Sequence, residues 1–307
     1  MNGVLVVDKP SGLTSHDVVN RVRRILQQTS VGHLGTLDPL ATGLLPLLTG
    51  NLTRLAQFYT SSEKTYEGVI RFGFATDTYD SDGELIGPTQ IVNVVLEQII
   101  ELATGFVGMI DQMPPPFSAK KIKGVPAYKL ARKHQDVPLK AVPVEIKEFE
   151  ILGVERDRAN FRARVASGTY LRSVAHEMGQ KIGCGAHLAA LRRTALGEFS
   201  LSDAHTLEEL AAAALTGNPE DLLAMLIHPR RILPQLPCVT ANDEVTAQIR
   251  SGRAVNLPEL SGAKQVKVFA GQRELIAIAT RVAGTLFHPK VVLALGSPVQ
   301  MTNGNRR

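Results

Sequence analysis

The sequence has no tryptophan and only two cysteines, Cys184 and Cys238, among 307 residues. The cysteines are far apart and neither belongs to a C-x-x-C pair, which argues against a zinc site and against a disulfide framework. No apolar run is long enough to span a bilayer. The N-terminus has neither the basic region nor the cleavage site of a signal peptide. We therefore expect a protein of the reducing cytoplasm that does not enter a membrane.

Several ligand-binding motifs are also absent. The chain has no G-x-x-x-x-G-K-[ST] loop, no G-x-G-x-x-G after a strand, and no H-E-x-x-H helix. These absences give little support to phosphoryl transfer, hydride transfer or zinc hydrolysis.

Charge is distributed unevenly along the chain. The net charge is +5, and residues 233–307 carry nine Lys or Arg against four Asp or Glu, so this excess lies in the C-terminal segment. A basic surface gains affinity for a polyanion by neutralising phosphates and releasing counterions. A nucleic-acid partner is therefore plausible, although a slightly basic protein without one has the same composition.

The order of expected elements is that of an α+β protein without a regular βαβ repeat. Prolines after residue 232 mark a linker to a small β-rich module, which gives two domains, 1–232 and 233–307. Periodicity predicts strands at 3–9, 64–78, 144–155 and 158–168. It predicts helices at 14–26, 51–59, 94–105 and 169–183, then a loop with a short strand at 184–199 and further helices to about 231.

Residues 111–143 are rich in proline and weakly periodic. From Ser118 to Lys140 there are seven Lys or Arg and one acid, Asp136. Long segments of this kind are either functional or linkers. Lysines and aromatic residues suit contact with a sugar-phosphate backbone and with bases, while a solvated loop has the same composition.

Asp38 is the lone carboxylate of "GHLGTLDPLATG", and no Lys or Arg lies within six residues of it. Asp-Pro often simply forms a turn. Alternatively, Asp38 is a nucleophile, which has to stay ionised in an apolar cleft and therefore needs a cation. The candidate is Arg172 at the start of a helix, where a bidentate guanidinium would favour the carboxylate. The alternative for Arg172 is an arginine on a helix surface.

Six segments together resemble the TruB family of bacterial tRNA pseudouridine-55 synthases. They occur in the expected order between residues 3 and 210: "DKPSGLTSHDVV", "GHLGTLDPLATGLLP", "EKTYEGVIRFGFATDTYDSDGE", "PPPFSAKKIKGVPAYKLAR", "SGTYLRSVAHEMG" and "GAHLAALRRTALGEF". The resemblance implies a mixed, largely antiparallel sheet flanked by helices, followed by a PUA-like RNA-binding domain. It implies a monomer that isomerises a T-loop uridine of tRNA, without a cofactor, a metal or an obligatory protein partner.

The resemblance also implies roles for individual residues. Asp38 is the expected nucleophile, paired with Arg172, and the target base leaves its stack to reach them. Tyr66 stacks on the flipped base and assists a proton transfer at C5. His33 is expected to stack where the flipped base was, Tyr170 to contact the uridine, and Leu191 to form an apolar wall of the pocket. Lys9 is expected to stabilise a turn. RNA contacts are expected from the basic insert, or thumb (Lys120, Lys121, Lys123).

Two other functions remain open at this point. One is a tRNA-folding chaperone whose chemistry is secondary or absent. The other is the catalytic subunit of a guide-RNA particle, although such relatives usually carry longer basic extensions.

Overall fold

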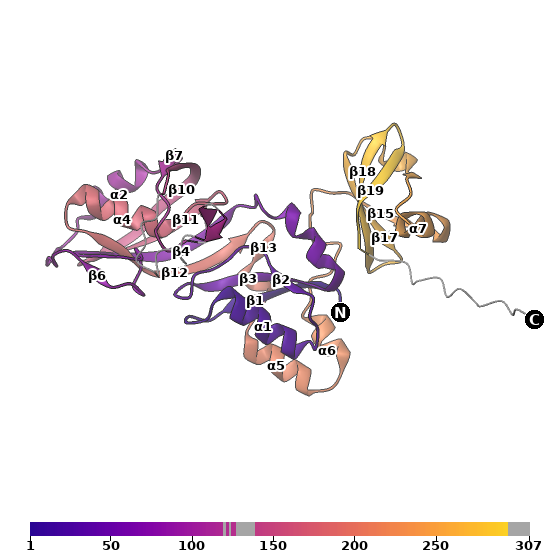
Figure 1. The fold of residues 1–307 in the computed structure, drawn as a ribbon, viewed down its shortest axis with the longest axis horizontal. Helices are drawn as coiled ribbons and strands as arrows, with labels where there is room; N and C mark the ends of the chain where they lie inside the picture. The colour runs from indigo at the N-terminus through magenta and orange to yellow at the C-terminus, as the bar shows by residue number, and fades with distance from the viewer. Residues whose placement is uncertain (119–120, 123, 127–138, 294–307) are drawn as a thin grey trace, which may run out of the picture.

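The computed structural model describes residues 1–118, 121–122, 124–126 and 139–293. Figure 1 shows an elongated molecule in which a large mixed sheet is followed by a smaller C-terminal sheet. Two short ribbons pair β5 (Ala75–Thr76) with β6 (Leu85–Ile86) and β8 (Lys121–Ile122) with β9 (Val125–Pro126). Within the described ranges, no helix is both long and apolar enough to cross a membrane.

The large sheet has ten strands, mostly antiparallel. Its main path runs in the order β14 (Ala204–His205), β1 (Gly3–Lys9), β3 (Thr42–Thr49), β12 (Ala186–Leu196), β4 (Lys64–Phe72), β11 (Arg158–Val165), β10 (Val142–Glu155) and β7 (Gly108–Gln112). The short strands β2 (Val31–His33) and β13 (Phe199–Ser200) pair with β3 and β12. Only β1–β14 and β3–β12 are parallel pairs among the described strands of this sheet. The expected sheet type is confirmed.

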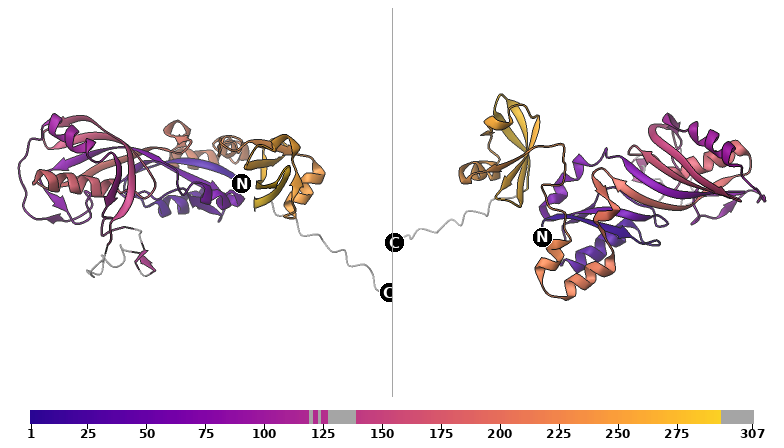
Figure 2. Two further views of the ribbon diagram at one scale, coloured as in Figure 1. Left: turned by 90° about the horizontal axis from the view of Figure 1, so that it is seen from above. Right: turned by 180° about the vertical axis from the view of Figure 1, so that it is seen from behind.

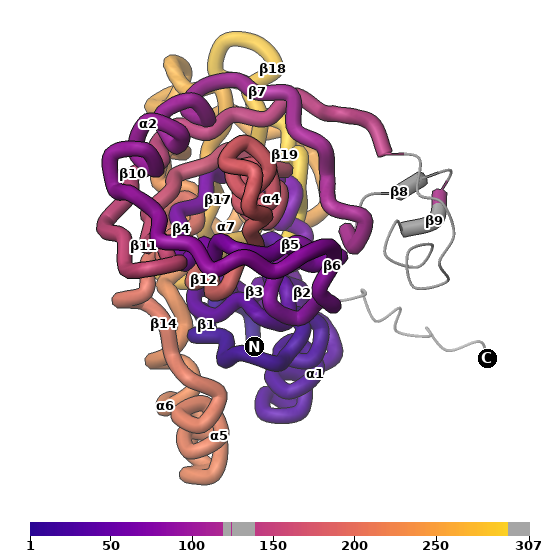
Figure 3. The backbone as a smooth tube through the Cα atoms, turned by 90° about the vertical axis from the view of Figure 1, so that its left-hand side faces the viewer, coloured from indigo at the N-terminus to yellow at the C-terminus, as the bar shows by residue number. Residues whose placement is uncertain are grey.

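Both faces of this sheet are covered, which explains the apolar run Val4–Val7 in β1. Leu5 and Val7 join the core beneath the helices, whereas Val4 and Val6 join a second core on the opposite face. A strand buried on both faces has no polar alternation. The helical side carries α1 (Ser15–Ile25), α2 (Leu96–Thr104), α4 (Leu171–Ile182) and α5 (Leu207–Leu215). Figure 3 shows α1 and α5 together below β1.

The predicted helices form with the expected ends. Thr14 and Asp17 make a capping box at the start of α1. Gly183 adopts the left-handed conformation after α4. Residues near 51–59 form a 3-10 helix, η1 (Gly50–Phe58), and the helices before residue 231 include η2 (Leu201–Asp203) and α6 (Pro219–Ala224).

The prediction for residues 184–199 is wrong. Instead of a loop with a short strand, this segment forms β12, an 11-residue strand inserted between β3 and β4. Its polar residues obscure the pattern, because Arg193 is buried and Arg192 pairs with Asp8 although 40% of its side chain is exposed. Strand β3 was also not expected, since Pro46 lies in its middle and proline rarely occupies an inner strand.

The C-terminal segment forms the expected β-rich unit with its own small core. Its elements are β15 (Cys238–Ala241), α7 (Asp243–Arg250), β16 (Val255–Asn256), η3 (Pro258–Leu260), β17 (Gln265–Ala270), β18 (Glu274–Ala283) and β19 (Leu286–Val292). Figure 2 shows this unit at one end of the molecule. Phe269 and Ile278 also pack into the second core of the large sheet, and Arg54 of η1 donates a hydrogen bond to the Val292 carbonyl at 2.7 Å.

Candidate active site

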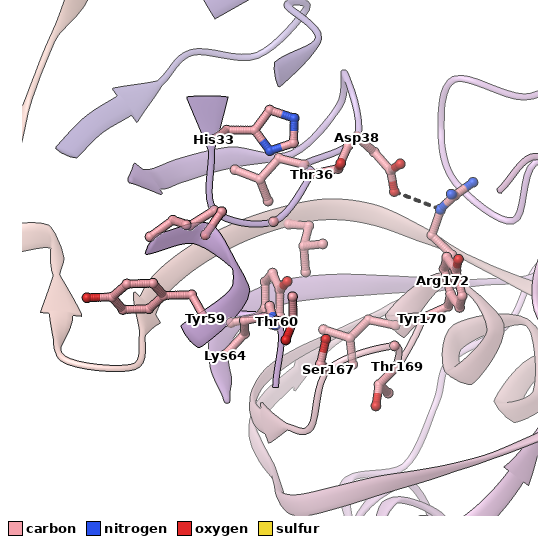
Figure 4. Close-up of a pocket in the computed structure, with 18 residues that line it drawn as sticks. His33, Thr36, Asp38, Tyr59, Thr60, Lys64, Ser167, Thr169, Tyr170 and Arg172 are labelled. Carbon is pink, nitrogen blue, oxygen red and sulfur yellow. Dashed lines mark ion pairs between the residues drawn. The ribbon is translucent and has the colours of Figure 1, made fainter. Parts of the chain in front are cut away.

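A cavity of about 460 Å³ opens on the large sheet where β2, β4, β12 and the start of α4 meet. Residues predicted from distant parts of the sequence line it together: His33, Asp38, Tyr66, Tyr170, Arg172 and Leu191. Figure 4 shows Asp38 and Arg172 pointing toward one another at one end of the cavity.

The loop that carries Asp38 is held by hydrogen bonds with side chains of β1 and α1. The Lys9 ammonium is 0% exposed and donates to the carbonyls of Pro10, Pro39 and Ala41 at 2.9, 3.2 and 2.6 Å. Ser15, the first residue of α1, accepts from the Leu37 amide at 2.8 Å. Lys9 therefore ties the turn, as the sequence led us to expect.

Asp38 takes part in a turn and also faces the cavity. Its carbonyl accepts a hydrogen bond from the Ala41 amide at 3.1 Å, with Pro39 in the following position. The chain leaves the turn through Gly43, whose φ is +93° and where a Cβ atom would lie 2.3 Å from the Arg193 carbonyl oxygen. The two interpretations of the Asp-Pro pair are thus compatible.

Arg172 supplies the cation that Asp38 requires. Its Nε lies 2.9 Å from Asp38 Oδ2, and its side chain is 6% exposed. The expected bidentate contact is absent, because Nη1 donates to the Thr78 carbonyl and Nη2 to the Phe117 carbonyl, both at 3.0 Å. Nε is not aligned for a full hydrogen bond, so the contact is an ion pair. The alternative of a surface arginine is wrong.

A second carboxylate shares this guanidinium. Asp80 Oδ2 lies 3.4 Å from Arg172 Nη1, and its side chain is 6% exposed. Asp80 accepts hydrogen bonds from the Thr78 hydroxyl at 2.6 Å and from the Asp82 amide at 3.1 Å. The sequence analysis missed Asp80 because "DTYDSDGE" contains several acids in one turn, and nothing in the pattern marks which of them is buried.

Burial dominates the protonation of Asp38. It raises the pKa of Asp38 above its ordinary value, and the charge of Arg172 lowers it only in part, while Asp80 raises it further. The side chain keeps 39% of its accessible surface, which opens onto the cavity, but the dense protein around it still disfavours the charge. Asp38 is therefore a carboxylate held near a substrate site at some electrostatic cost.

The start of α4 is held by the first residues of the basic insert, at the end of β7 and directly after it. The buried Gln112 of β7 accepts from the Tyr170 amide at 2.8 Å and donates to the Tyr170 carbonyl at 3.0 Å. Ser173 donates to the Met113 carbonyl at 2.7 Å. Burial raises the pKa of Tyr170, so its hydroxyl stays protonated at neutral pH. Tyr170 and Arg172, which lie together at the start of α4, are therefore held in place by the same two residues, Gln112 and Met113.

The opposite wall is aromatic and apolar. Tyr66 points inward from β4 and is 9% exposed. Burial, assisted by the charge of Arg193, lowers the pKa of His33, which therefore presents a neutral imidazole at pH 7. Leu191 adds an aliphatic surface from β12. A flat, uncharged ring fits such walls.

The lysines of the site are Lys64, at the cavity, and those predicted in the thumb. Lys64 lines the cavity, and burial lowers its pKa to about 8, although the sequence analysis did not select it. The predicted RNA contacts Lys120 and Lys123 lie outside the described residues, and of Lys121 only the backbone, in β8, is described.

The site has the groups for nucleophilic chemistry at carbon. It combines one accessible carboxylate, a fixed guanidinium, and an aromatic pocket. Across the described parts of the chain, no cluster of three or more His, Cys, Asp or Glu side chains is arranged to hold a metal ion.

Comparisons with known proteins match one family over most of the chain. Residues 23–171 match the family model described as TruB family pseudouridylate synthase (N terminal domain), and residues 172–232 match that of the tRNA pseudouridylate synthase B C-terminal domain. The chain is 48% identical to the tRNA pseudouridine synthase B of Solibacter usitatus, over 95% of this chain and all of the relative. It is 37% identical to that of an Azoarcus species, over 96% and 95% of the two chains.

A solved structure shares the fold. The chain superimposes with a TM-score of 0.71 on one described as a Cbf5-Nop10-Gar1 complex, at 26% identity, covering 95% of this chain and 85% of that one.

Proposed function

Because the chain belongs to the TruB family of pseudouridylate synthases, we propose that it isomerises the T-loop uridine at position 55 of tRNA to pseudouridine. That the protein is a tRNA pseudouridine synthase, an isomerase, rests on relatives 36–48% identical over most of the chain. The finer assignment of the target uridine follows from the resemblance of the six sequence segments.

The observation that carries the mechanism is the ion pair of Asp38 and Arg172 at the cavity. Pseudouridine formation breaks the bond between N1 and C1′ of uridine and joins C5 to C1′. The carboxylate of Asp38 attacks C1′, adds to C6 or removes a proton to form a glycal, and these routes remain open. Arg172 holds the carboxylate in its charged form against the effect of burial.

The cavity walls receive the base after it leaves the RNA stack. Tyr66 stacks on the uracil and assists the proton transfer at C5, Tyr170 contacts the uridine, and Leu191 packs on its other side. His33 takes the place that the base leaves in the T-loop. Its neutral imidazole suits stacking among bases.

We divide the chain into a catalytic domain, residues 1–232, and a PUA-like RNA-binding domain, residues 233–307. Support comes from the separate five-stranded sheet and from the family models, which end at residue 232. The basic thumb, residues 111–143, supplies lysines that contact the T-arm of the tRNA. The protein acts in the cytoplasm as a monomer without an obligatory protein partner, unlike the Cbf5 structure, which was solved in a complex.

Tritium release from tRNA labelled at uridine C5 tests the proposal. Wild-type protein should release tritium from position 55, and Asp38→Asn should reduce release at least about 1,000-fold while tRNA affinity stays within about threefold. A tRNA-folding chaperone would refold the T-arm equally well with either protein. Release that persists in Asp38→Asn would remove Asp38 from the mechanism, and release from another uridine would correct the target.

A further inference from the structure

Arg193 is a buried cation that the proposed mechanism does not use. Its side chain is 0% exposed in the centre of the large sheet, where β12 pairs with β3 on one side and β4 on the other. No Asp or Glu of the described residues forms an ion pair with it. An isolated buried charge is costly, so a partner that becomes negative at some stage would repay that cost.

Two of its three nitrogens hold the loop of Asp38. Nε donates to the Leu44 carbonyl at 2.7 Å, and Nη2 donates to the Gly35 carbonyl at 3.1 Å. These carbonyls lie on either side of Asp38 in the chain, so Arg193 ties both ends of the loop. The third nitrogen, Nη1, is buried without an acceptor of full hydrogen-bond geometry among the described residues.

The candidate partner of the Arg193 guanidinium is the Tyr66 hydroxyl. Arg193 and Tyr66 are paired across β12 and β4. Burial lowers the pKa of Arg193, and Tyr66 opposes that shift by charge and by hydrogen bonding. The other ionisable groups facing Arg193 are Lys9, His33 and Lys64, and its charge lowers the pKa of each. Tyr66 is thus the only one of these neighbours that can become negative.

We propose that Arg193 is a positioning residue that holds the Tyr66 oxygen at the base and stabilises negative charge on it during proton transfer. An RNA phosphate does not fill this role, because Arg193 is fully covered by protein. The inference rests on the proposed function, since it assigns Tyr66 to the proton transfer at C5.

The proton transfer balances without another reactant. When the N1–C1′ bond breaks, its electron pair remains on uracil N1, and Tyr66 gives its hydroxyl proton to that nitrogen, directly or through a water molecule. After C5 joins C1′, the Tyr66 phenolate takes the C5 proton, and the C–H electron pair restores the C5–C6 double bond. Tyr66 is again a phenol, and one proton has moved from C5 to N1.

A double-mutant cycle on the single-turnover rate tests the coupling. Arg193→Lys keeps a buried cation, but one ammonium cannot replace three directed nitrogens. We expect it to slow turnover about 30-fold in the wild-type background and about threefold or less beside Tyr66→Phe, with tRNA affinity unchanged. Arg192→Lys is the matched control, because Arg192 pairs with Asp8 outside the cavity, and it should keep the wild-type rate.

Equal losses from Arg193→Lys in both Tyr66 backgrounds would overturn the proposal and leave Arg193 as a tie for the loop. A loss confined to tRNA binding would overturn it as well. A wild-type protein that releases no tritium would instead refute the proposed function.

The contact can also be tested with Arg193 intact, in case its variants do not fold. In ¹⁵N NMR spectra, the Arg193 Nε–H signal should shift and exchange faster with solvent in Tyr66→Phe than in the wild type. An unchanged signal would show that the two side chains do not interact, and would overturn the proposal.

Discussion

Arg172 meets Asp38 through Nε alone, at 2.9 Å from Oδ2. Its two terminal nitrogens bond to backbone carbonyls of Thr78 and Phe117. The guanidinium is therefore held in place by the protein even when Asp38 moves toward a substrate, so that the carboxylate can turn without carrying its counterion along.

Replacing Arg172 should therefore affect turnover more than binding. Arg172→Met is expected to lower the single-turnover rate at least about 100-fold while tRNA affinity changes by less than about threefold. Arg172→Lys should not restore the rate, since an ammonium cannot reach Asp38 and both carbonyls together. Weak binding with a normal rate in either variant would contradict this prediction.

The acid limb of the pH–rate profile should lie above the pKa of an ordinary aspartate. The reaction needs charged Asp38, whose pKa is raised by burial, so the rate falls as pH falls through that raised value. Asp80→Asn removes a negative charge that raises this pKa and should move the limb to lower pH. Single-turnover rates between pH 4 and 8 measure the shift, and a limb that moves upward would contradict the assignment.

Lys9 should make stability increase with pH in the alkaline range. Burial lowers its pKa from 10.5 to about 8, so between these values the unfolded chain binds more protons than the folded one and the free energy of unfolding rises with pH. Lys64 has the same shift, and each lysine contributes up to about 1.4 kcal/mol per pH unit.

Urea unfolding of Lys9→Met from pH 8 to 10.5 measures the contribution of Lys9. The slope assigned to the two lysines should fall by about half. An unchanged slope would mean that Lys9 has the same charge in the folded and the unfolded chain over this pH range, which would contradict the prediction.

The thumb lysines should govern the salt dependence of tRNA binding. Replacing Lys120, Lys121 and Lys123 together by glutamine should reduce the slope of log K against log salt by about two. The turnover rate at saturating tRNA should change little. A slope identical to that of the wild type would place the phosphate contacts elsewhere.

The sequence was sufficient for much of the site because its residues stand in distinctive local contexts. Asp38 lies in a loop without cations, and Arg172 follows a turn at a helix start, so chemistry alone suggested that they pair. The α+β class followed from the order of the elements and most helices followed from periodicity. The sheet type and the roles of His33, Tyr170 and Leu191 came from the resemblance to the TruB family.

What could not be predicted depends on long-range packing. The length of β12 was missed because the partners of Arg192 and Arg193, namely Asp8 and the Leu44 carbonyl, lie far away in sequence. Asp80 was missed because its burial depends on α4, which lies far along the chain. The single Asp38–Arg172 contact, rather than a bidentate one, follows from the carbonyls that occupy the other nitrogens.

The insertion of β12 between β3 and β4 also has a consequence for synthesis on the ribosome. Strand β3, which follows the Asp38 loop, and strand β4, which carries Tyr66, emerge early, but the strand that joins them is translated more than a hundred residues later. Until then, β3 and β4 have exposed edges that are open to wrong pairing. The nascent chain therefore depends on its last central strand to become both active and safe from aggregation.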